Sequence, residues 1–421
     1  MTAPDPMQAE NGSNPARDLP RKAPGGGINL LAGLRILDLT TSIAGPYATQ
    51  ILSDFGAEII KIERPGQGDD SRSWGPPFLD GYSLWYASVN RNKKSVELDL
   101  RKDEGYGVFL NLLRVCDAFV TNQLPKLRQR LRIDYETLAE QKSNLVYVSL
   151  TGHGSDGPRA EWPCYDIIAE GYSSVMDVTG EAANDPQKVG TPAADLLAGS
   201  DAATACIAAL FDASRNGRGH FVDISMIDSM TRLMSPRIMT YLGSGIVPRR
   251  TGAKDSVIAV YQTFETADEM ITLALPNDNI WHRFWQAVGQ PELGSDPRFA
   301  TSADRHAHRA EIVLAIAKIL HMRSRKDWLD LFNELQIPAG PINRIDQVTQ
   351  DAELKRKGLF FSIETDNEPM PQCGLGIRID GRDSGFRSAP PTLGQHTDEV
   401  LRDVLGYDSI RIGRLKDAGI I

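Results

Sequence analysis

From Ala32 onward, short apolar runs alternate with longer segments in which apolar residues recur every three or four positions. Short apolar runs are typical of buried β-strands, and the longer spacing is typical of helices with one buried face. Strands are predicted at 35–39, 58–62, 96–98, 118–121 and 145–150, with helices at 45–55, 104–115 and 135–142 between them. This alternation predicts an α/β fold with a mostly parallel sheet and helices on both faces.

The second half of the chain has a different pattern. Helices are predicted at 166–178 and 196–213, followed by a strand at 221–224 and a helix at 227–241. Short strands at 261–264 and 270–275, with helices at 279–288, 306–321 and 326–335, predict a smaller α+β domain. Pro338-Ala339-Gly340-Pro341 ends the last of these helices. Strands at 359–364 and 375–379 and a helix from Thr397 indicate a return to the first domain.

These patterns divide the chain into four parts. Residues 1–27 are rich in Pro, Gly, Asn, Asp and Ala and contain no apolar segment of the kind found in a signal peptide, so we expect a disordered tail there. Residues 28–225 are expected to form the first part of a large domain. Residues 226–340 are expected to form a linker helix and a small domain, and 341–421 to rejoin the large domain.

Composition narrows the class of protein. The 421 residues suffice for two or three domains. The net charge of −9 disfavours a nucleic acid or an anionic membrane as partner, and no run approaches the roughly 20 apolar residues of a membrane-spanning helix. The four cysteines lie far apart, without a CxxC pair or a Cys/His cluster, and suggest neither a metal site nor disulfides. A cytoplasmic location fits this composition best.

The first predicted strand–helix turn, residues 40–46, occupies the place where dinucleotide-binding folds carry GxGxxG. It contains a single glycine, which disfavours such a site. Pro46 near the helix start and the free backbone donors before it could still bind an anion or an adenosine phosphate. The alternative is a plain connection.

The second predicted strand ends in Glu63-Arg64, where nucleotide-binding folds contact the ribose. Glu63 suits a ribose hydroxyl, and Arg64 suits a phosphate on that ribose, as in coenzyme A. The alternative is a solvated basic residue at a strand end.

Asp195 lies immediately before an apolar run of helical period. The common role of an aspartate there is an N-cap. The functional alternative is a carboxylate nucleophile, kept ionised by the helix N-terminus, that attacks an activated acyl group. Gly190 and Gly199 on either side would allow a ligand or another backbone to approach closely.

Several short motifs occur in a fixed order along the chain. They are Gly33-Leu34-Arg35-Ile36-Leu37-Asp38-Leu39, Ala44-Gly45-Pro46, Gly56-Ala57-Glu58-Ile59-Ile60-Lys61-Ile62-Glu63-Arg64-Pro65, Gly68-Asp69, Asn92-Lys93-Lys94-Ser95, Tyr165-Asp166, the Asp195 segment, Gly217-Arg218-Gly219-His220, Ile337-Pro338-Ala339-Gly340-Pro341 and Gly394-Gln395-His396-Thr397. From about Ala32 to the end, the chain resembles the family III CoA-transferases of the CaiB/BaiF type, which include formyl-CoA:oxalate and carnitine CoA-transferases.

The resemblance implies a Rossmann-like large domain built from both chain ends, a smaller α+β middle domain, and an interlocked homodimer. It places the catalytic aspartate at Asp195, which favours the nucleophile over the N-cap. The substrates it implies are an acyl-CoA donor and a carboxylic acid acceptor. CoA passes through an aspartyl anhydride and an aspartyl-CoA thioester, with no metal and no tightly bound cofactor.

The resemblance also assigns CoA-contacting positions. They are Ile43, Ala44, Arg64, Leu98 to Arg101, Asn122, Gln123, Arg130 and Met226. Arg64 and Arg130 are the expected phosphate partners because one guanidinium group can donate two parallel hydrogen bonds to a phosphate. Met226 would line the adenine pocket or belong to the core.

Some positions depart from the family pattern. Thr41 and Ile43 replace a histidine and a glutamine of the formyl-CoA type, and residues 249–253 lack its glycine-rich loop. The 2-methylacyl-CoA racemases share the fold but need a base, normally a histidine, where this chain has Tyr165. Two alternatives to a transferase stay open: such a racemase, and a CoA-ester-binding subunit of a hetero-oligomer.

Overall fold

The computed structural model describes residues 14–365 and 368–421, which form two compact units. Unit 1 comprises the described part of Met1–Ser173 together with Gly190–Leu233 and Thr349–Ile421, and unit 2 comprises Ser174–Val189 and Met234–Val348. The boundaries therefore differ from those expected at 226 and 340. Residues 226–233 stay with unit 1 because that helix packs against Ala193–Asn216.

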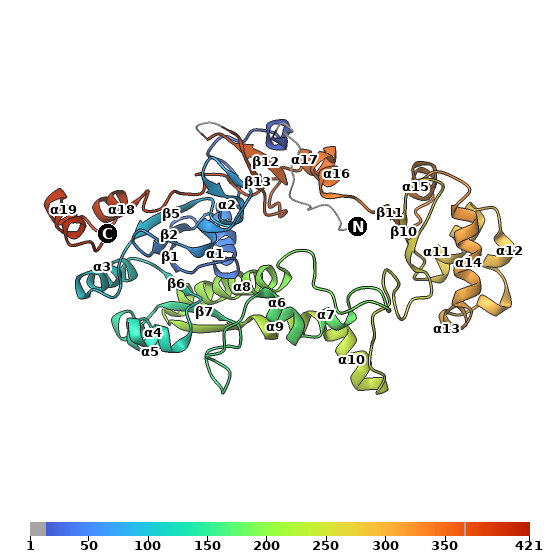
Figure 1. Cartoon of the computed structure of the whole chain (residues 1–421), viewed down its shortest axis with the longest axis horizontal. Coiled ribbons are helices and arrows are strands. Elements are labelled where there is room, and N and C mark those ends of the chain that lie inside the picture. Colours follow the sequence, from blue (N-terminus) through green and yellow to red (C-terminus); the bar gives the residue numbers. More distant parts are fainter. Residues whose placement is uncertain (1–13, 366–367) are drawn as a thin grey trace, which may run out of the picture. The chain divides into compact units, whose positions relative to one another are not determined.

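Unit 1 is built on a six-stranded, entirely parallel sheet in the order β5-β2-β1-β6-β7-β8 (Figure 1). The strands are β1 Arg35–Leu39, β2 Glu58–Glu63, β5 Lys93–Glu97, β6 Ala118–Thr121, β7 Val146–Thr151 and β8 His220–Ser225. Leu37 of β1 lies opposite Ile60 and Phe119 of its two neighbours. The α/β fold with a mostly parallel sheet is confirmed.

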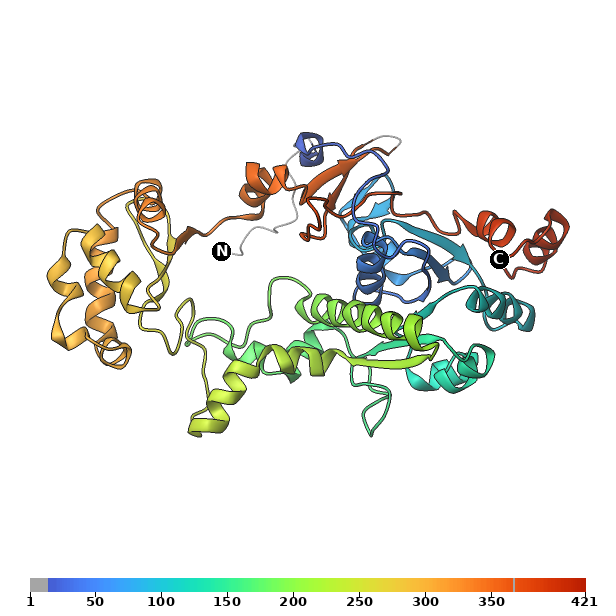
Figure 2. The same cartoon turned by 180° about the vertical axis from the view of Figure 1, so that it is seen from behind.

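Helices cover both faces of this sheet, as Figure 2 shows from behind. The helical elements of unit 1 are η1 Pro15–Asp18, α1 Ala44–Asp54, η2 Asp70–Ser73, α2 Leu84–Ser88, α3 Asp103–Arg114, α4 Pro125–Leu131, α5 Tyr135–Gln141, α6 Asp166–Tyr172, α8 Ala193–Asn216, α9 Met226–Leu233, α17 Ala352–Arg356, α18 Thr397–Asp403 and α19 Ser409–Asp417. Helices α1 and α8 pack on each other, α1 against β1, β2 and β6 and α8 against β7 and β8. A buried cluster from α3, α5, α18 and α19 covers the side chains on the opposite face of the sheet.

Short strand pairs complete unit 1. They are β3 Phe78–Leu79 with β4 Tyr82–Ser83, and β12 Phe360–Ile363 with β13 Met370–Cys373. The prediction of a strand at 375–379 is wrong, since β12 pairs with Met370–Cys373 instead. Within residues 375–379, Gly376 has a φ of 73°, which breaks the extended backbone that a strand needs.

Residues 14–27, expected to be a disordered tail, are ordered by contacts with the C-terminal part of unit 1. Arg21 pairs with Ser362 and Gly25 with Phe386, and the Lys22 ammonium donates to Asp383 at 2.9 Å. Composition could not indicate this pairing because the partners lie more than 300 residues away. Residues 1–13 lie outside the described part of the chain.

Unit 2 contains an antiparallel sheet in the order β11-β10-β9. Its elements are α7 Val175–Val178, α10 Ser235–Ser244, β9 Tyr261–Phe264, β10 Ile271–Ala274, α11 Asp278–Ala287, α12 Pro291–Gly294, η3 Pro297–Phe299, α13 Ser302–Ala307, α14 Arg309–Leu320, α15 Arg325–Glu334 and β11 Ala339–Pro341. Helix α16, Ile345–Gln350, crosses the boundary between the units. Trp281, Trp285 and Trp328 anchor a core of apolar side chains from the helices and the sheet.

Three long predicted helices are each divided in two. The helix predicted at 166–178 breaks at Ser174, whose φ is 67°, and the one predicted at 227–241 breaks before Pro236, at the start of α10. The helix predicted at 306–321 breaks at His308. Apolar periodicity continues across such breaks, so it cannot reveal them.

Helix α8 corrects the expectation that no segment reaches the length and apolarity of a membrane-spanning helix. Its 24 residues pass that test by length and composition, because alanine raises its hydropathy without long apolar runs. The helix packs against α1, α6, α9, β7 and β8 within unit 1. We interpret it as a core helix of that unit.

Candidate active site

A cavity of about 320 Å³ opens at the carboxyl ends of β1, β2, β5 and β6. In parallel sheets, ligands bind at this edge, where neighbouring strands connect in opposite directions. Its lining residues are Leu39, Thr41, Ile62, Glu63, Arg64, Pro65, Gly68, Asp69, Asp70, Leu98, Asp99, Leu100, Arg101, Gln123, Leu127, Arg130 and Leu131. It thus brings together seven of the eleven positions assigned to CoA contact.

The three arginines of this cavity differ in how they are paired. Arg64 contacts Asp70 at 2.8 Å, and Arg101 forms two hydrogen bonds with Asp99 at 2.8 and 2.9 Å. Hydrogen bonding to Arg101 lowers the pKa of Asp99 below its ordinary value. Arg130, at the end of α4, is exposed, and its guanidinium has no hydrogen bond or ion pair with any described residue. Arg130 is therefore the cation best placed to accept a phosphate without losing another partner.

The other four assigned positions lie outside the lining of this cavity. The Asn122 amide is used to hold the turn after β1, because it accepts from the Thr41 N–H at 3.1 Å and donates to the Thr41 carbonyl at 2.8 Å. Ile43 and Ala44 are buried at the start of α1, and Met226 is buried at the start of α9.

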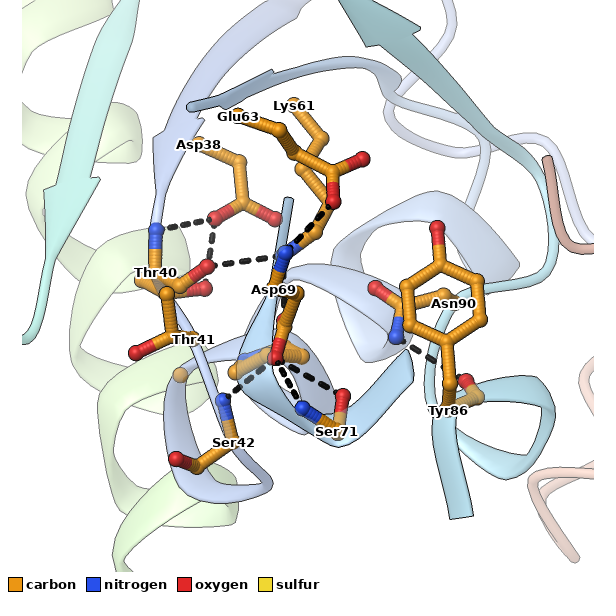
Figure 3. Close-up of polar contacts among 12 residues, drawn as sticks. Asp38, Thr40, Thr41, Ser42, Lys61, Glu63, Asp69, Ser71, Tyr86 and Asn90 are labelled. Atoms are coloured by element: carbon orange, nitrogen blue, oxygen red, sulfur yellow. Dashed lines mark hydrogen bonds and ion pairs between the residues drawn. The ribbon is translucent and has the colours of Figure 1, made fainter. Parts of the chain in front are cut away.

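A buried charge network lies beneath the same turn (Figure 3). The Lys61 ammonium donates to the Thr40 carbonyl at 2.7 Å and to Asp69 at 2.9 Å, and Asp69 accepts from the Ser42 N–H at 2.9 Å. Burial alone would raise the pKa of Asp69, but Lys61 and the backbone donors hold it below its ordinary value. Sequence reasoning missed these residues. A lysine within the otherwise apolar strand 59–62 was the available signal.

Asp195 lies in the first turn of α8 and does not cap the helix. The N-cap is Pro192, which makes no side-chain hydrogen bond, and the capping carboxylate comes from another helix. Asp166, at the start of α6, accepts from the N–H groups of Ala194 at 2.8 Å and Asp195 at 3.3 Å. The N-cap alternative for Asp195 is therefore wrong.

The Asp195 carboxylate itself has no hydrogen-bond donor among the described residues and is only partly exposed. Burial, followed by repulsion from Asp166, raises its pKa from 3.8 to about 7. Burial and the charge of Asp195 together raise the pKa of the nearby Cys164 thiol to about 11. The ionised form of Asp195 is thus destabilised relative to its neutral form. A covalent bond to one of its oxygens would remove this unfavourable charge.

A second cavity, of about 300 Å³, is lined by residues that flank Asp195 along the chain. Thr191 and Pro192 before α8 and Leu196 in its first turn line this cavity, together with Ile43 before α1 and Tyr47 within it. Trp85, Arg91 and Cys373 also contribute to its wall.

Close packing fixes the distance between α1 and α8. A Cβ atom on Gly199 would lie 2.6 Å from the Ala44 carbonyl oxygen and 3.0 Å from the Tyr47 ring. Only glycine allows this approach. The turn that carries Ile43 and Ala44 is thereby held against the helix that carries Asp195.

Residues 14–365 and 368–421 contain no group of three or more His, Cys, Asp or Glu side chains that could hold a metal ion. Unit 1 itself supplies the Asp195 carboxylate, whose pKa is raised, and a strand-end cavity lined in part by arginines.

Comparison with known proteins places this geometry in a family. Residues 31–397 match the family model described as CoA-transferase family III. The chain is 35% identical over 401 residues to human succinyl-CoA:glutarate CoA-transferase, covering 94% of this chain and 90% of that protein. It is 34% identical over 394 residues to the succinate–glutarate CoA-transferase of Agrobacterium fabrum, covering 92% of this chain and 97% of that protein.

A solved structure is similar in fold as well. The crystal structure of a CaiB/BaiF family protein from Brucella suis superposes with a TM-score of 0.78 at 33% identity, covering 90% of this chain and all of that chain.

Proposed function

Because the chain belongs to CoA-transferase family III, we propose that it transfers coenzyme A from an acyl-CoA donor to a carboxylate acceptor, with Asp195 as the nucleophile. The observation that carries this proposal is the Asp195 carboxylate, which is unpaired among the described residues and has a pKa raised to about 7. Such a group is partly desolvated before the reaction, so little solvation is lost when it attacks. The names of the human and Agrobacterium relatives support succinyl-CoA as the donor.

The proposed first step is attack by an Asp195 oxygen on the thioester carbonyl. The new C–O bond gives a mixed anhydride, and the C–S bond breaks to release the CoA thiolate. The thiolate then attacks the Asp195 side-chain carbonyl, which releases the donor acid and leaves an aspartyl-CoA thioester. This exchange conserves the activation of the thioester, provided that water is excluded.

The acceptor carboxylate reverses these two steps. It attacks the aspartyl thioester, which forms an acceptor–aspartyl anhydride and releases the thiolate again. The thiolate attacks the acceptor carbonyl, the new acyl-CoA leaves, and the Asp195 carboxylate is restored. No proton is consumed over the full cycle, because a carboxylate enters and a carboxylate leaves.

The two cavities suggest how the substrate lies. We assign the adenosine phosphates to the strand-end cavity, where Arg130 is free and Arg64 and Arg101 can exchange their aspartates for phosphate oxygens. We assign the acyl group to the cavity lined by Leu196 and Ile43, whose wall is mainly apolar. The turn at Ile43 and Ala44 then lies between the two ends of the substrate.

We also propose that two copies of the chain form a homodimer. Helix α10 has no buried residue, and Met239, Leu242 and Ile246 on and after it are 66%, 68% and 72% exposed. A cluster of large exposed apolar side chains indicates a protein–protein surface. Light scattering of the wild type and of Leu242→Asp tests this: we expect a dimer and a shift toward monomer. A wild-type monomer would contradict it.

The mechanism is tested by mass spectrometry of the protein incubated with succinyl-CoA and then treated with hydroxylamine or borohydride. We expect a donor-dependent modification on the peptide that contains Asp195. Asp195→Ala should bind CoA but show neither modification nor transfer, and Asp212→Asn, at the far end of α8, serves as the matched control and should behave as wild type.

Other outcomes identify the alternatives. Exchange of the α-proton of a 2-methylacyl-CoA into deuterated water, without modification of Asp195, would indicate a racemase. Binding of CoA esters with neither modification nor exchange would indicate a binding subunit that requires a partner. Transfer that survives in Asp195→Ala would refute the assignment of the nucleophile.

A further inference from the structure

The β1–α1 turn is taken here as residues 40–46, which follow β1 and include the first three residues of α1, and it packs on fully buried charged side chains. Lys61 and Lys93 are both 0% exposed, although lysine is among the side chains least often buried. Asp38 and Asp69 are 0% and 1% exposed. None of these four side chains can touch the solvent, so whatever they do, they do through the backbone and side chains around them.

Lys61 and Asp69 hold the first half of the turn. Lys61 is the donor to the Thr40 carbonyl, and Asp69 is the acceptor for the Ser42 N–H. Ser42 has a φ of 69°, a left-handed conformation that non-glycine residues rarely adopt. The ion pair between Lys61 and Asp69, at 2.9 Å, joins the two contacts into one brace.

Lys93 holds the second half of the turn, and Asp38 links its start to α1. The Lys93 ammonium donates to the Pro46 carbonyl at 2.8 Å, and Asp38 accepts from the Thr40 N–H at 2.9 Å and the Thr49 hydroxyl at 2.6 Å. The two halves are linked, since Thr40 is contacted from both sides. Residues 43 and 44 lie between these fixed points.

Charge balance explains how the network is tolerated. With Glu63 and Arg72, which pair at 2.7 Å, the network contains three carboxylates and three basic side chains, although burial lowers the pKa of Lys93 to about 7. Buried ion pairs are often no more stabilising than apolar residues of the same volume, so their main effect is to fix one conformation. Here the conformation that they fix is that of the turn.

We infer that Lys61 and Asp69 are positioning residues of the transferase, which hold the β1–α1 turn so that Ile43 and Ala44 are presented to the acyl-CoA. This inference rests on the proposed function, because it takes the turn to contact the substrate. Asp69 belongs to the lining of the strand-end cavity, but its side chain, like that of Lys61, is fully buried, so both act through the backbone of Thr40 and Ser42.

The test compares Lys61→Met with the double variant Lys61→Met/Asp69→Asn. Lys61→Met keeps the length of the side chain but removes the donor to Thr40 and leaves Asp69 without its cation. The double variant restores the charge balance, and its Asn oxygen can still accept from Ser42, but the Thr40 carbonyl still lacks a donor. Arg305→Met, which removes a buried cation of unit 2, is the matched control for loss of stability.

We expect Lys61→Met to raise the KM for acyl-CoA and the Kd for CoA at least tenfold, with less than a threefold change in kcat. The double variant should regain thermal stability but keep the raised KM. Hydrogen–deuterium exchange should become faster in the peptide covering residues 40–46 in both variants. Arg305→Met should lose stability with unchanged KM and unchanged exchange in that peptide.

Three results would overturn the inference: a folded Lys61→Met variant with wild-type KM and Kd, recovery of both stability and KM in the double variant, or an equal rise of KM in Arg305→Met. If Lys61→Met does not fold, Asp69→Ala, which removes the acceptor for the Ser42 N–H, provides the comparison of KM and exchange. The Kd for CoA is measured without turnover, and Asp195 labelling is followed in the wild type. Failure of the proposed transferase function is therefore recognised separately.

Discussion

Replacing Asp195, the proposed nucleophile, should make the protein more stable while removing the proposed activity. In the folded chain, burial and Asp166 raise the pKa of Asp195 from 3.8 to about 7, so an ionised Asp195 opposes folding at neutral pH and above. The full rise corresponds to about 4 kcal/mol, since each pH unit is about 1.4 kcal/mol. The side chain keeps some solvent contact, so we expect about 2–3 kcal/mol of stabilisation for Asp195→Asn at pH 8.

The sign of this effect depends on pH. A carboxyl whose pKa is raised on folding lowers stability progressively between its unfolded value of 3.8 and its folded value of about 7. The advantage of Asp195→Asn should therefore be full above pH 7 and should shrink to about 1 kcal/mol or less near pH 4.5. Urea unfolding followed by circular dichroism, at both pH values, measures the difference in the free energy of unfolding.

Asp212→Asn, in the same helix, is the control in which the carboxylate has a lowered pKa instead of a raised one. Its carboxylate accepts from His220, which lowers its pKa, so this exposed residue should lose a little stability or none on replacement. The reasoning is refuted if Asp195→Asn is no more stable than the wild type at pH 8. It is equally refuted if the gain is the same at pH 4.5 as at pH 8.

Three further outcomes follow from the site. The kcat/KM of the donor half-reaction should rise through about pH 7 as Asp195 ionises, and Asp166→Asn should move that midpoint to lower pH by removing a repelling charge, as pH–rate profiles would show. Arg130→Ala should raise the KM for acyl-CoA roughly 10- to 100-fold, more than Arg64→Ala, because Arg64 already has a partner; steady-state kinetics with CoA and dephospho-CoA esters would check this. Gly199→Ala should lower both melting temperature and kcat, because its Cβ would lie 2.6 Å from a backbone oxygen of α1, and calorimetry with an activity assay would detect both losses.

The sequence predicts strand positions in the sheet closely because buried parallel strands are short, apolar and separated by periodic helices. The bounds of β1 and β6 are those expected, and those of β2 and β7 differ by one residue. The breaks in long helices were missed because they depend on single backbone conformations, such as the positive φ of Ser174. Pairing of residues 14–27 was missed because it depends on contacts far along the chain.

The candidate site was predicted unevenly for similar reasons. Arg64 could be placed at this edge because it follows a strand of a parallel sheet, whereas Arg101 and Arg130 were assigned through the family resemblance. The pKa of Asp195 could not be predicted, since it depends first on burial and then on Asp166, which lies 29 residues earlier and reaches α8 only in three dimensions. The buried network was also missed, because charge balance among Asp38, Lys61 and Asp69 depends on which side chains share one face.

The contact between α1 and α8 at Gly199 limits how the site can change during evolution or engineering. Most active sites can be widened or narrowed by altering side chains on the helices that frame them. Here a missing side chain sets the separation, so the only available change at that position is enlargement, which pushes the helices apart. Under the proposed function, new acyl specificities would therefore have to arise from residues that line the cavities elsewhere, such as Trp85, while the spacing between Asp195 and the β1–α1 turn stays constant.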